Sequence, residues 1–277
     1  YGFLTGRGKH ESWFWVTFLW SAGGEAMEYD PNANQWSTTY DSRNAAVALD
    51  YYTLLCSEKW IDADGSIRRG YTNKDAGNIW AECAEGKVAM VAHYIAENVF
   101  SNINQDITGM APIPLGPTGM RAGELNSQMM GIYSGVENPV IRDAAWEYMR
   151  WTDSDAATRI KTKILVEGGL GRFLNPDLLR KYGYDEIVRL SPKGWAEMFD
   201  IAIETGRPEP YGRNSNLAYT MMTEPLQAAE QEARKDALPD YDLDEHPGLE
   251  GDTKAEKLMS LYRRYIRNPD FHHERLD

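Results

Sequence analysis

Residues 79–92 read Ile-Trp-Ala-Glu-Cys-Ala-Glu-Gly-Lys-Val-Ala-Met-Val-Ala, and this stretch predicts a helix that runs directly into a strand. Asp75 has the side chain of an N-cap, and Gly86 can adopt the left-handed conformation that ends a helix. The apolar run Val88–Ala92 is typical of a strand covered on both faces. We therefore expect a helix over residues 75–85, followed by a buried strand.

This helix–Gly-Lys-x-Ala-Met turn resembles a recurring element of the extracellular solute-binding proteins of ABC importers, the family that includes maltose-binding protein. Other segments resemble that family in the same order along the chain, over roughly residues 1 to 230. The resemblance implies an α/β fold of the periplasmic-binding-protein type II class, in which two lobes close over a ligand by hinge bending. The segments that carry it are Tyr1–Phe3, Phe18–Glu25, Gly109–Pro117, Gly131–Ser134 and Asn138–Tyr148.

The resemblance also divides the chain between two lobes. In the family, the segment equivalent to Tyr1–Phe3 lies well inside the protein. We therefore expect this sequence to be the C-terminal portion of a longer exported protein, with most of the first lobe and the export signal outside it. The expected parts are 1–122 as the first part of the second lobe, 123–130 as a hinge crossing, 131–208 as the returning part of the first lobe, 209–213 as a second crossing, and 214–277 as the last part of the second lobe and a tail.

The composition is that of a soluble globular chain, with 277 residues, 42% hydrophobic and 26% charged. A formal net charge of -13 disfavours a nucleic-acid surface and an anionic membrane surface, because both require clustered Lys and Arg. The sequence has no apolar run long enough to span a bilayer. The resemblance implies a periplasmic or extracellular, membrane-associated protein that is a monomer, needs no cofactor and delivers its ligand to ABC permease subunits.

Strand and helix signals alternate along the chain, which indicates an α/β fold. Ser42 and Asn138 are placed to cap helices, and Pro139 suits a first helical turn. We expect the helix after Asn138 to turn Ile141, Ala145, Tyr148 and Met149 inward. The expected helices are 42–56, 75–85, one that begins after Asn138, and then 154–167, 192–206, 214–235 and 252–267.

Trp13 and Glu11 lie in a Trp-rich segment where the family places an aromatic and an acidic residue facing the cleft. Sugar rings offer an apolar face and a rim of hydroxyl groups, which aromatic rings and carboxylates can recognise. The alternative is that this segment fills the core, and for Trp20 we favour that interpretation.

His93 and Tyr94 directly follow the predicted strand. Ligands of open α/β sheets bind beyond the carboxyl ends of the strands, so these two side chains are candidates for ligand contacts, with a surface turn as the alternative. Asn214 and Tyr219 begin the 214–235 helix, where free N–H groups and an amide suit hydroxyl recognition. N-capping of this helix is an equally good explanation for Asn214.

Two acidic turns and two cysteines leave alternatives open. The stretch from Asp30 to Asp41 has the oxygen ligands of a calcium loop but Gln35 where the sharp turn needs glycine, so a polar turn is favoured. A polar turn is also favoured over a calcium site for residues 62–65. Cys56 and Cys83 form a disulfide or remain two buried thiols; the helices that carry them would have to pack side by side, as the resemblance implies.

The sequence contains no nucleophile elbow, P-loop or complete dinucleotide fingerprint. Pairs such as Glu204 and Glu209 could suit a glycosidase, but 42 acidic residues produce such pairs by chance. We therefore expect a binding protein that is not an enzyme and captures a carbohydrate, with an oligosaccharide as the leading ligand. The alternatives are a glycan-processing hydrolase or lyase and a two-lobed sensor domain. No metal site is expected, and the predicted ligand-binding residues are Glu11, Trp13, His93, Tyr94, Asn214 and Tyr219.

Overall fold

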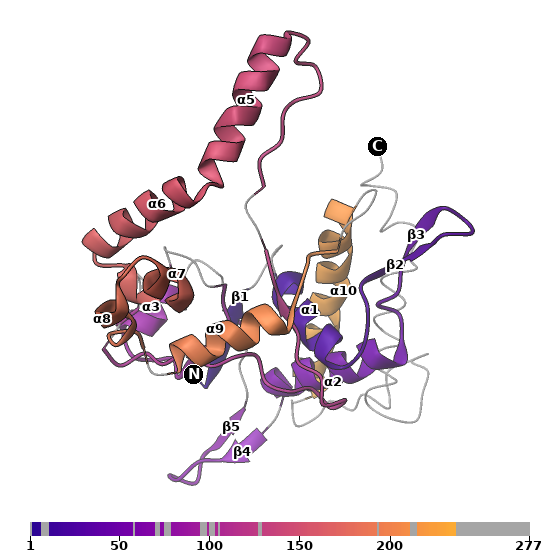
Figure 1. The fold of residues 1–277 in the computed structure, drawn as a ribbon. Helices are drawn as coiled ribbons and strands as arrows, with labels where there is room; N and C mark the ends of the chain where they lie inside the picture. Colours follow the sequence, from indigo (N-terminus) through magenta and orange to yellow (C-terminus); the bar gives the residue numbers. More distant parts are fainter. Residues whose placement is uncertain are drawn as a thin grey trace. The chain divides into compact units, whose positions relative to one another are not determined.

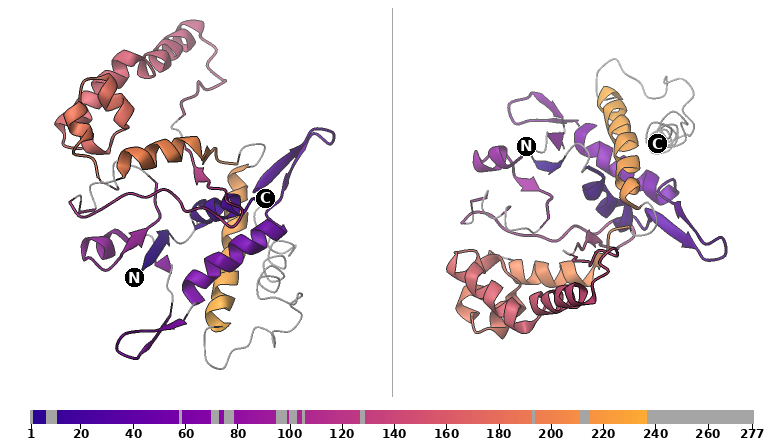
Figure 2. Two further views of the ribbon diagram at one scale, coloured as in Figure 1. Left: turned by 60° about the horizontal axis from the view of Figure 1, so that its bottom comes forward. Right: turned by 90° about the horizontal axis from the view of Figure 1, so that it is seen from above.

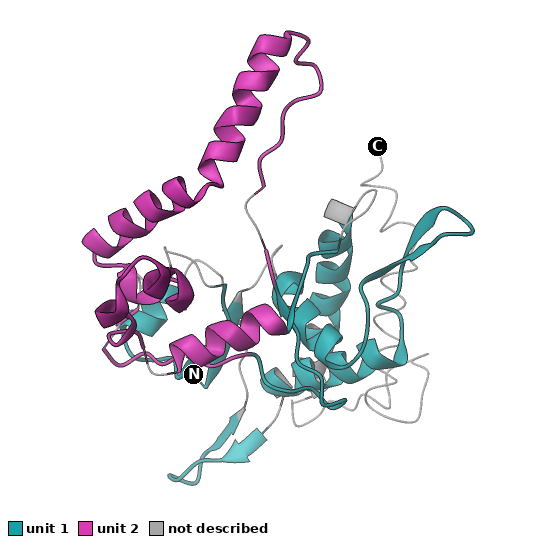
Figure 3. Ribbon diagram, viewed as in Figure 1, with its two compact units in different colours: residues 1–95, 113–124, 205–277 teal, residues 96–112, 125–204 magenta. Residues whose placement is uncertain are grey.

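The chain folds into two compact units in a computed structural model (Figures 1 and 3). Unit 1 comprises Tyr1–Ile95, Ile113–Glu124 and Thr205–Asp277, and unit 2 comprises Ala96–Pro112 and Leu125–Glu204. Residues 96–112 thus group with unit 2, whereas the assignment of units to two lobes stays a prediction. The structure describes residues 2–6, 11–57, 59–69, 73–74, 79–94, 99, 103–104, 106–126, 129–192, 194–210 and 215–236.

Unit 1 contains a parallel sheet in the order β6-β1-β7. Strand β1 (Phe3–Gly6) lies in the centre, paired with β6 (Asn73–Lys74) on one side and with β7 (Met90–Val91) on the other. Parallel strands need crossover connections, and helices supply them here. This arrangement confirms the predicted α/β class.

Helix α3 (Ile79–Ala84) ends as predicted, at Gly86 with a φ of +70°. The Lys87 N–H donates to the Glu82 carbonyl and the Gly86 N–H to the Cys83 carbonyl, both at 3.0 Å, which is the Schellman arrangement. The predicted N-cap, Asp75, lies outside the described residues. The prediction of a strand covered on both faces was wrong, because β7 is a two-residue strand paired with β1 and its Met90 is 61% exposed.

Three helices form the core of unit 1: α1 (Glu11–Ser21), α2 (Arg43–Ser57) and α10 (Ser215–Asp236). Each packs against the other two, although α10 is far from the others in sequence (Figure 2). The Ser42 hydroxyl caps α2, as predicted, by accepting from the Ala45 N–H at 3.2 Å. The core confirms Trp20 as an interior residue, and its buried members include Trp15, Leu19, Trp20, Leu49, Tyr52, Met222 and Leu226.

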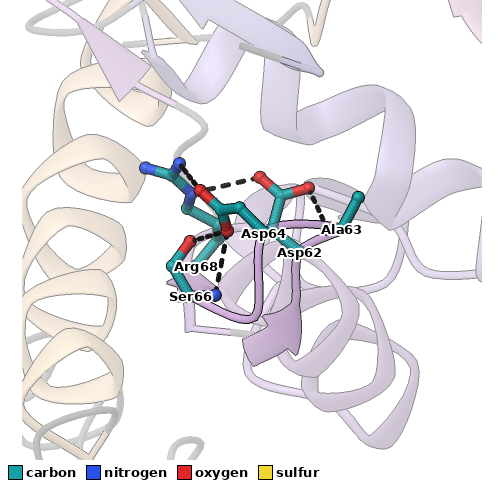
Figure 4. Close-up of polar contacts among 5 residues, drawn as sticks. All are labelled: Asp62, Ala63, Asp64, Ser66 and Arg68. Atoms are coloured by element: carbon teal, nitrogen blue, oxygen red, sulfur yellow. Dashed lines mark hydrogen bonds and ion pairs between the residues drawn. The ribbon is translucent and has the colours of Figure 1, made fainter.

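Both acidic turns belong to β-hairpins. The first joins β2 (Met27–Asp30) to β3 (Gln35–Thr38), and Asp30 Oδ1 accepts from the Asn32 N–H at 2.8 Å. The second joins β4 (Lys59–Ile61) to β5 (Ile67–Arg69). There the Arg68 guanidinium spans two carboxylates, 3.2 Å from Asp62 and 3.3 Å from Asp64 (Figure 4). Backbone N–H groups and an arginine therefore satisfy these carboxylates, as the polar-turn interpretation requires.

Unit 2 is helical; the predicted cap at Asn138 is confirmed, and a helix begins after Ser154 as predicted. The Asn138 side chain accepts from the Val140 N–H at 3.0 Å, and the Ser154 hydroxyl accepts from the Ala157 N–H at 3.3 Å. A small core contains Phe173, Trp195 and Met198. The helices are α5 (Pro139–Thr152), α6 (Asp155–Glu167), the 3-10 helix η2 (Gly171–Phe173), α7 (Pro176–Lys181), α8 (Asp185–Val188) and α9 (Trp195–Glu204).

The predicted inward face of α5 was wrong for this chain. Ile141 is 58% and Tyr148 is 62% exposed, and α5 has no buried residue. Ile141 and Tyr148 share a helical face with Val140 and Trp151, as the periodicity indicates. Within the described residues, no segment covers that face. The predicted helix over 192–206 is shorter, as α9, and the one over 252–267 lies outside the described residues.

Strands β8 (Gly123–Glu124) and β9 (Gly206–Arg207) form a short parallel pair in unit 1. The segment before β8 is fastened to the end of α1, where the Thr118 hydroxyl donates to the Ser21 carbonyl at 2.9 Å. Gly116 approaches the same carbonyl so closely that an added Cβ would lie 2.1 Å from its oxygen. Only glycine fits there without movement of the backbone.

We expect Gly116→Ala to destabilise unit 1 by about 1–3 kcal/mol, because the new methyl group overlaps a backbone oxygen. Urea denaturation followed by tryptophan fluorescence would measure the loss. Gly123→Ala is the matched control, since a Cβ there meets no atom within 4 Å. Equal stabilities for the two variants would contradict the packing described.

Candidate functional site

Aromatic side chains from four parts of unit 1 gather beyond the carboxyl end of β7. The Trp13 ring packs edge-on against Tyr219 at a centroid distance of 5.5 Å and against Tyr94 at 6.3 Å. The Phe14 ring lies 5.8 Å from both Tyr94 and His93, and Trp80 lies 4.8 Å from His93. We call this group the aromatic cluster; its members are Trp13, Phe14, Trp80, His93, Tyr94 and Tyr219.

A pair of carboxyl groups lies against the two tyrosines of the cluster. The Tyr94 and Tyr219 hydroxyls both donate to the same oxygen of Glu124, Oε2, each at 3.0 Å. The Glu124 side chain is also hydrogen-bonded to that of Glu209. Because ionised carboxylates only accept hydrogen bonds, the pair must hold a proton for this bond to form.

Burial and the bond to Glu209 raise the pKa of Glu124 to about 7, against an opposing effect of the two tyrosine donors. Burial and the nearby charge of Glu124 raise the pKa values of Tyr94 and Tyr219 well above the usual range. The tyrosines therefore remain donors at every physiological pH, whereas Glu124 changes its charge near neutrality.

Buried hydrogen bonds between α1 and α10 hold Trp13 beside Tyr219. The Ser12 hydroxyl donates to the Tyr219 carbonyl at 2.7 Å, and the Thr223 hydroxyl donates to Ser12 at 2.8 Å. Residues 12 and 13 are adjacent on α1, so the contact that fixes Ser12 also fixes the start of the Trp13 side chain. Ser12 and Tyr219 are 207 residues apart in sequence, so their contact depends on the tertiary fold.

Glu11 is fully buried and lies in the helical core. Its carboxylate accepts from the Tyr52 hydroxyl at 3.1 Å and from the Gln227 amide at 3.0 Å, which links α1 to α2 and to α10. Burial and the negative charge of Glu11 raise the pKa of Tyr52 well above its usual value. These contacts give Glu11 a structural role, so we leave it out of the proposed site.

Four of the predicted site residues are brought together: Trp13, His93, Tyr94 and Tyr219. Trp13 and Tyr94 are half-buried, and His93 is exposed. Partial desolvation beside its aromatic neighbours lowers the pKa of His93. Asn214 lies outside the described residues, and ligand contact by any of these residues stays a prediction.

Phe14, Trp80, Glu124 and Glu209 were not predicted from the sequence. A weak signal existed for Glu124, which lies in the segment 123–130 where the resemblance predicts a crossing. Glu209 lies in the predicted crossing 209–213, and its pairing with Glu204 in sequence carries no signal. No local signal distinguishes these two carboxylates from the other acidic residues, because their pairing depends on the tertiary fold.

Flat rings beside hydrogen-bonding carboxyl groups suit a ligand that has both apolar faces and hydroxyl groups. The Glu124–Glu209 pair does not suit glycoside hydrolysis, which needs two carboxyl groups about 5–10 Å apart with substrate or water between them. His, Cys, Asp and Glu side chains do not form a metal-binding group within the described residues. Of the helices in the described ranges, none has the length and apolar character to cross a bilayer.

Cys83 is a free thiol, so it forms no disulfide with Cys56. The side chain of Cys83 is partly buried, and that burial raises its pKa. The side chain of Cys56 lies outside the described residues. The thiol alternative therefore holds for Cys83.

The sequence matches no family model and no curated protein. The structure is similar to that of maltose-bound MalE3 from T. maritima, with a TM-score of 0.58 and 17% sequence identity. The similarity covers 96% of this chain and 60% of that chain, so this chain spans about three-fifths of its neighbour's length. At this identity the likeness shows the fold alone, and the predicted periplasmic-binding-protein type II fold is confirmed.

We expect Glu11→Ala to lower the free energy of unfolding by about 1–3 kcal/mol for each buried donor left without its acceptor. Glu11→Gln retains one acceptor oxygen and should have an intermediate stability. Urea denaturation of both variants tests the order. A Glu11→Ala protein as stable as the wild type would contradict the structural role of this carboxylate.

The raised pKa of Glu124 predicts that stability falls as the pH rises. The ordinary pKa of 4.5 applies to the unfolded chain, so between about pH 4.5 and pH 7 the folded state holds a proton that the unfolded state lacks. The stabilisation from this proton is fully present below about pH 4.5 and is lost as the pH rises from there to about 7. We expect Glu124→Gln to lack this pH-dependent part of the stability. Urea denaturation midpoints of the variant and the wild type at pH 5, 6, 7 and 8 would measure the difference.

The exposed Glu197 on α9 provides the control, and Glu197→Gln should keep the wild-type dependence on pH. If Glu124→Gln and the wild type lose stability in parallel between pH 5 and pH 8, the carboxyl pair does not hold the proton.

Proposed function

We propose that this protein is the substrate-binding component of an ABC importer and that it captures a carbohydrate, with an oligosaccharide as the leading ligand. The observation that carries the proposal is the aromatic cluster, which joins Trp13, Tyr94 and Tyr219 to the carboxyl group of Glu124. Its rings would stack on sugar faces, and its carboxyl pair would bond to sugar hydroxyls.

The fold supports a binding role. MalE3 of T. maritima has this fold and was solved with maltose bound. By extension, we propose that the protein belongs to the extracellular solute-binding family 1. It would act in the periplasm or outside the cell in association with the membrane, with ABC permease subunits as its partners. The two units would then act as lobes that close over the ligand by hinge bending, with closure favoured by contacts made only in the closed state.

Helices α5 and α6 support the proposal that this sequence works as the C-terminal portion of a longer binding protein. Their exposed apolar side chains include Val140, Ile141, Tyr148 and Trp151 on one face of α5, and Ile160 and Ile164 on α6. An apolar face of this kind is ordinarily covered in a stable monomer. We propose that the remainder of the first lobe covers it.

Binding without turnover is the favoured activity. The carboxyl groups of Glu124 and Glu209 are in hydrogen-bond contact, which leaves no room between them for a scissile bond or an attacking water. The alternative of a glycan-processing enzyme therefore has no support from this pair.

We expect isothermal titration calorimetry of the mature protein with a panel of oligosaccharides to give saturable heat at a one-to-one ratio. Trp13→Ala should weaken that binding about tenfold or more, since tenfold corresponds to about 1.4 kcal/mol of stacking and burial. Trp60→Ala removes a half-exposed tryptophan on β4 and should bind as the wild type does.

Two results would contradict the proposal. Heat that continues to flow after each injection would indicate turnover. Binding by Trp13→Ala that equals binding by the wild type would place the ligand away from the aromatic cluster.

A further inference from the structure

Glu124 connects the two tyrosines of the aromatic cluster through one oxygen atom. Tyr94 follows β7 and Tyr219 belongs to α10, and their hydroxyls meet at Glu124 Oε2 in β8, each at 3.0 Å. Three segments distant in sequence thus converge on a single acceptor. The position of that atom sets where both rings are held, and Trp13 packs against both rings.

The proton between Glu124 and Glu209 adds a variable charge to this acceptor. Within the described residues, the groups that act on Glu124 include the two tyrosine hydroxyls and the Glu209 carboxyl group. Arg207, its register partner in the β8–β9 pair, donates instead to Glu25 at 2.6 Å and lies over the Trp20 ring at 5.2 Å. Loss of the proton would leave two adjacent negative carboxylates, which repel each other.

We propose that Glu124 is the positioning residue of this site and that its protonated pair with Glu209 holds the tyrosine rings ready for a neutral ligand. Loss of the proton drives the two carboxylates apart, and Glu124 carries the tyrosine hydroxyls with it. This inference rests on the proposed function, because it concerns the same site. The protonated pair makes the site selective for uncharged carbohydrates, and the affinity for them is highest below neutral pH.

The glutamine variant separates positioning from charge. In Glu124→Gln, the amide oxygen can still accept from both tyrosines, and the amide N–H₂ can donate to Glu209. The variant therefore imitates the protonated pair at every pH. Glu124→Ala removes the acceptor and should weaken ligand binding at every pH.

The first test is titration calorimetry, at pH 6 and pH 8, with the neutral oligosaccharide that binds most tightly. If ligand binding raises the pKa of the pair by about one unit, wild-type affinity falls about fivefold over this interval. Glu124→Gln should bind at pH 8 as the wild type does at pH 6. The control Glu197→Gln should keep the wild-type dependence. Wild-type affinity that is constant or rises with pH, or an unchanged pH profile in Glu124→Gln, would overturn the inference.

The second test needs no ligand, so it distinguishes a failure of this inference from a failure of the proposed function. The indole ¹H–¹⁵N signal of Trp13, assigned by its loss in Trp13→Phe, should move with a midpoint near pH 7, because Trp13 contacts both tyrosines. The movement should vanish in Glu124→Gln. A signal that does not move in the wild type, or moves equally in the variant, would refute the positioning role even if carbohydrate binds. A protein that shows the movement but binds no carbohydrate would refute the proposed function and leave the coupling of Glu124 to the rings supported.

Discussion

The buried contact between α1 and α10 is the constraint on which the proposed site depends. Glu11 and Ser12 on α1 meet Thr223 and Gln227 on α10 through hydrogen bonds of 2.8–3.0 Å, and all but the partly buried Gln227 are buried. Hydrogen bonds between buried groups specify geometry more narrowly than apolar packing does, because a displaced partner leaves an unsatisfied polar atom. This contact fixes the relative position of the two helices, and with it the meeting of Trp13 and Tyr219.

Two glutamates of unit 1, one fully buried and one half-buried, lie beside tyrosine hydroxyls. The inner carboxylate, Glu11, is enclosed by donors from α2 and α10 and supports the fold. The outer carboxyl group, Glu124, is half-buried against tyrosine donors and a second carboxyl group, so its protonation changes near neutral pH. The difference between Glu11 and Glu124 lies in these surroundings, since both are glutamates beside tyrosine hydroxyls.

Local chemistry predicted much of the fold. The stop at Gly86, the caps at Ser42 and Asn138, and the burial of Trp20 follow from rules that act within a few residues. The exposure of Met90 and of the apolar face of α5 could not be predicted in this way. Periodicity identifies which face of an element is apolar, but not whether another segment covers it.

The grouping of the candidate residues was predictable where position along an element suffices. His93 and Tyr94 follow β7, and the carboxyl ends of strands are where ligands of α/β folds bind. Glu11 and Glu124 show the limit. Glu11 lies beside Trp13 in sequence but turns into the core, whereas Glu124 is distant in sequence and joins the cluster through β8. Residue type and spacing do not distinguish these outcomes, which depend on the packing of α1 against α2 and α10.

A crystal structure of the protein with a bound oligosaccharide tests the central claim most directly. Our account predicts a sugar ring stacked on Trp13 or Tyr94, the half-buried rings of the cluster, with its hydroxyls within hydrogen-bond distance of Glu209 or Glu124. A sugar bound elsewhere on the protein, with the aromatic cluster untouched, would contradict it.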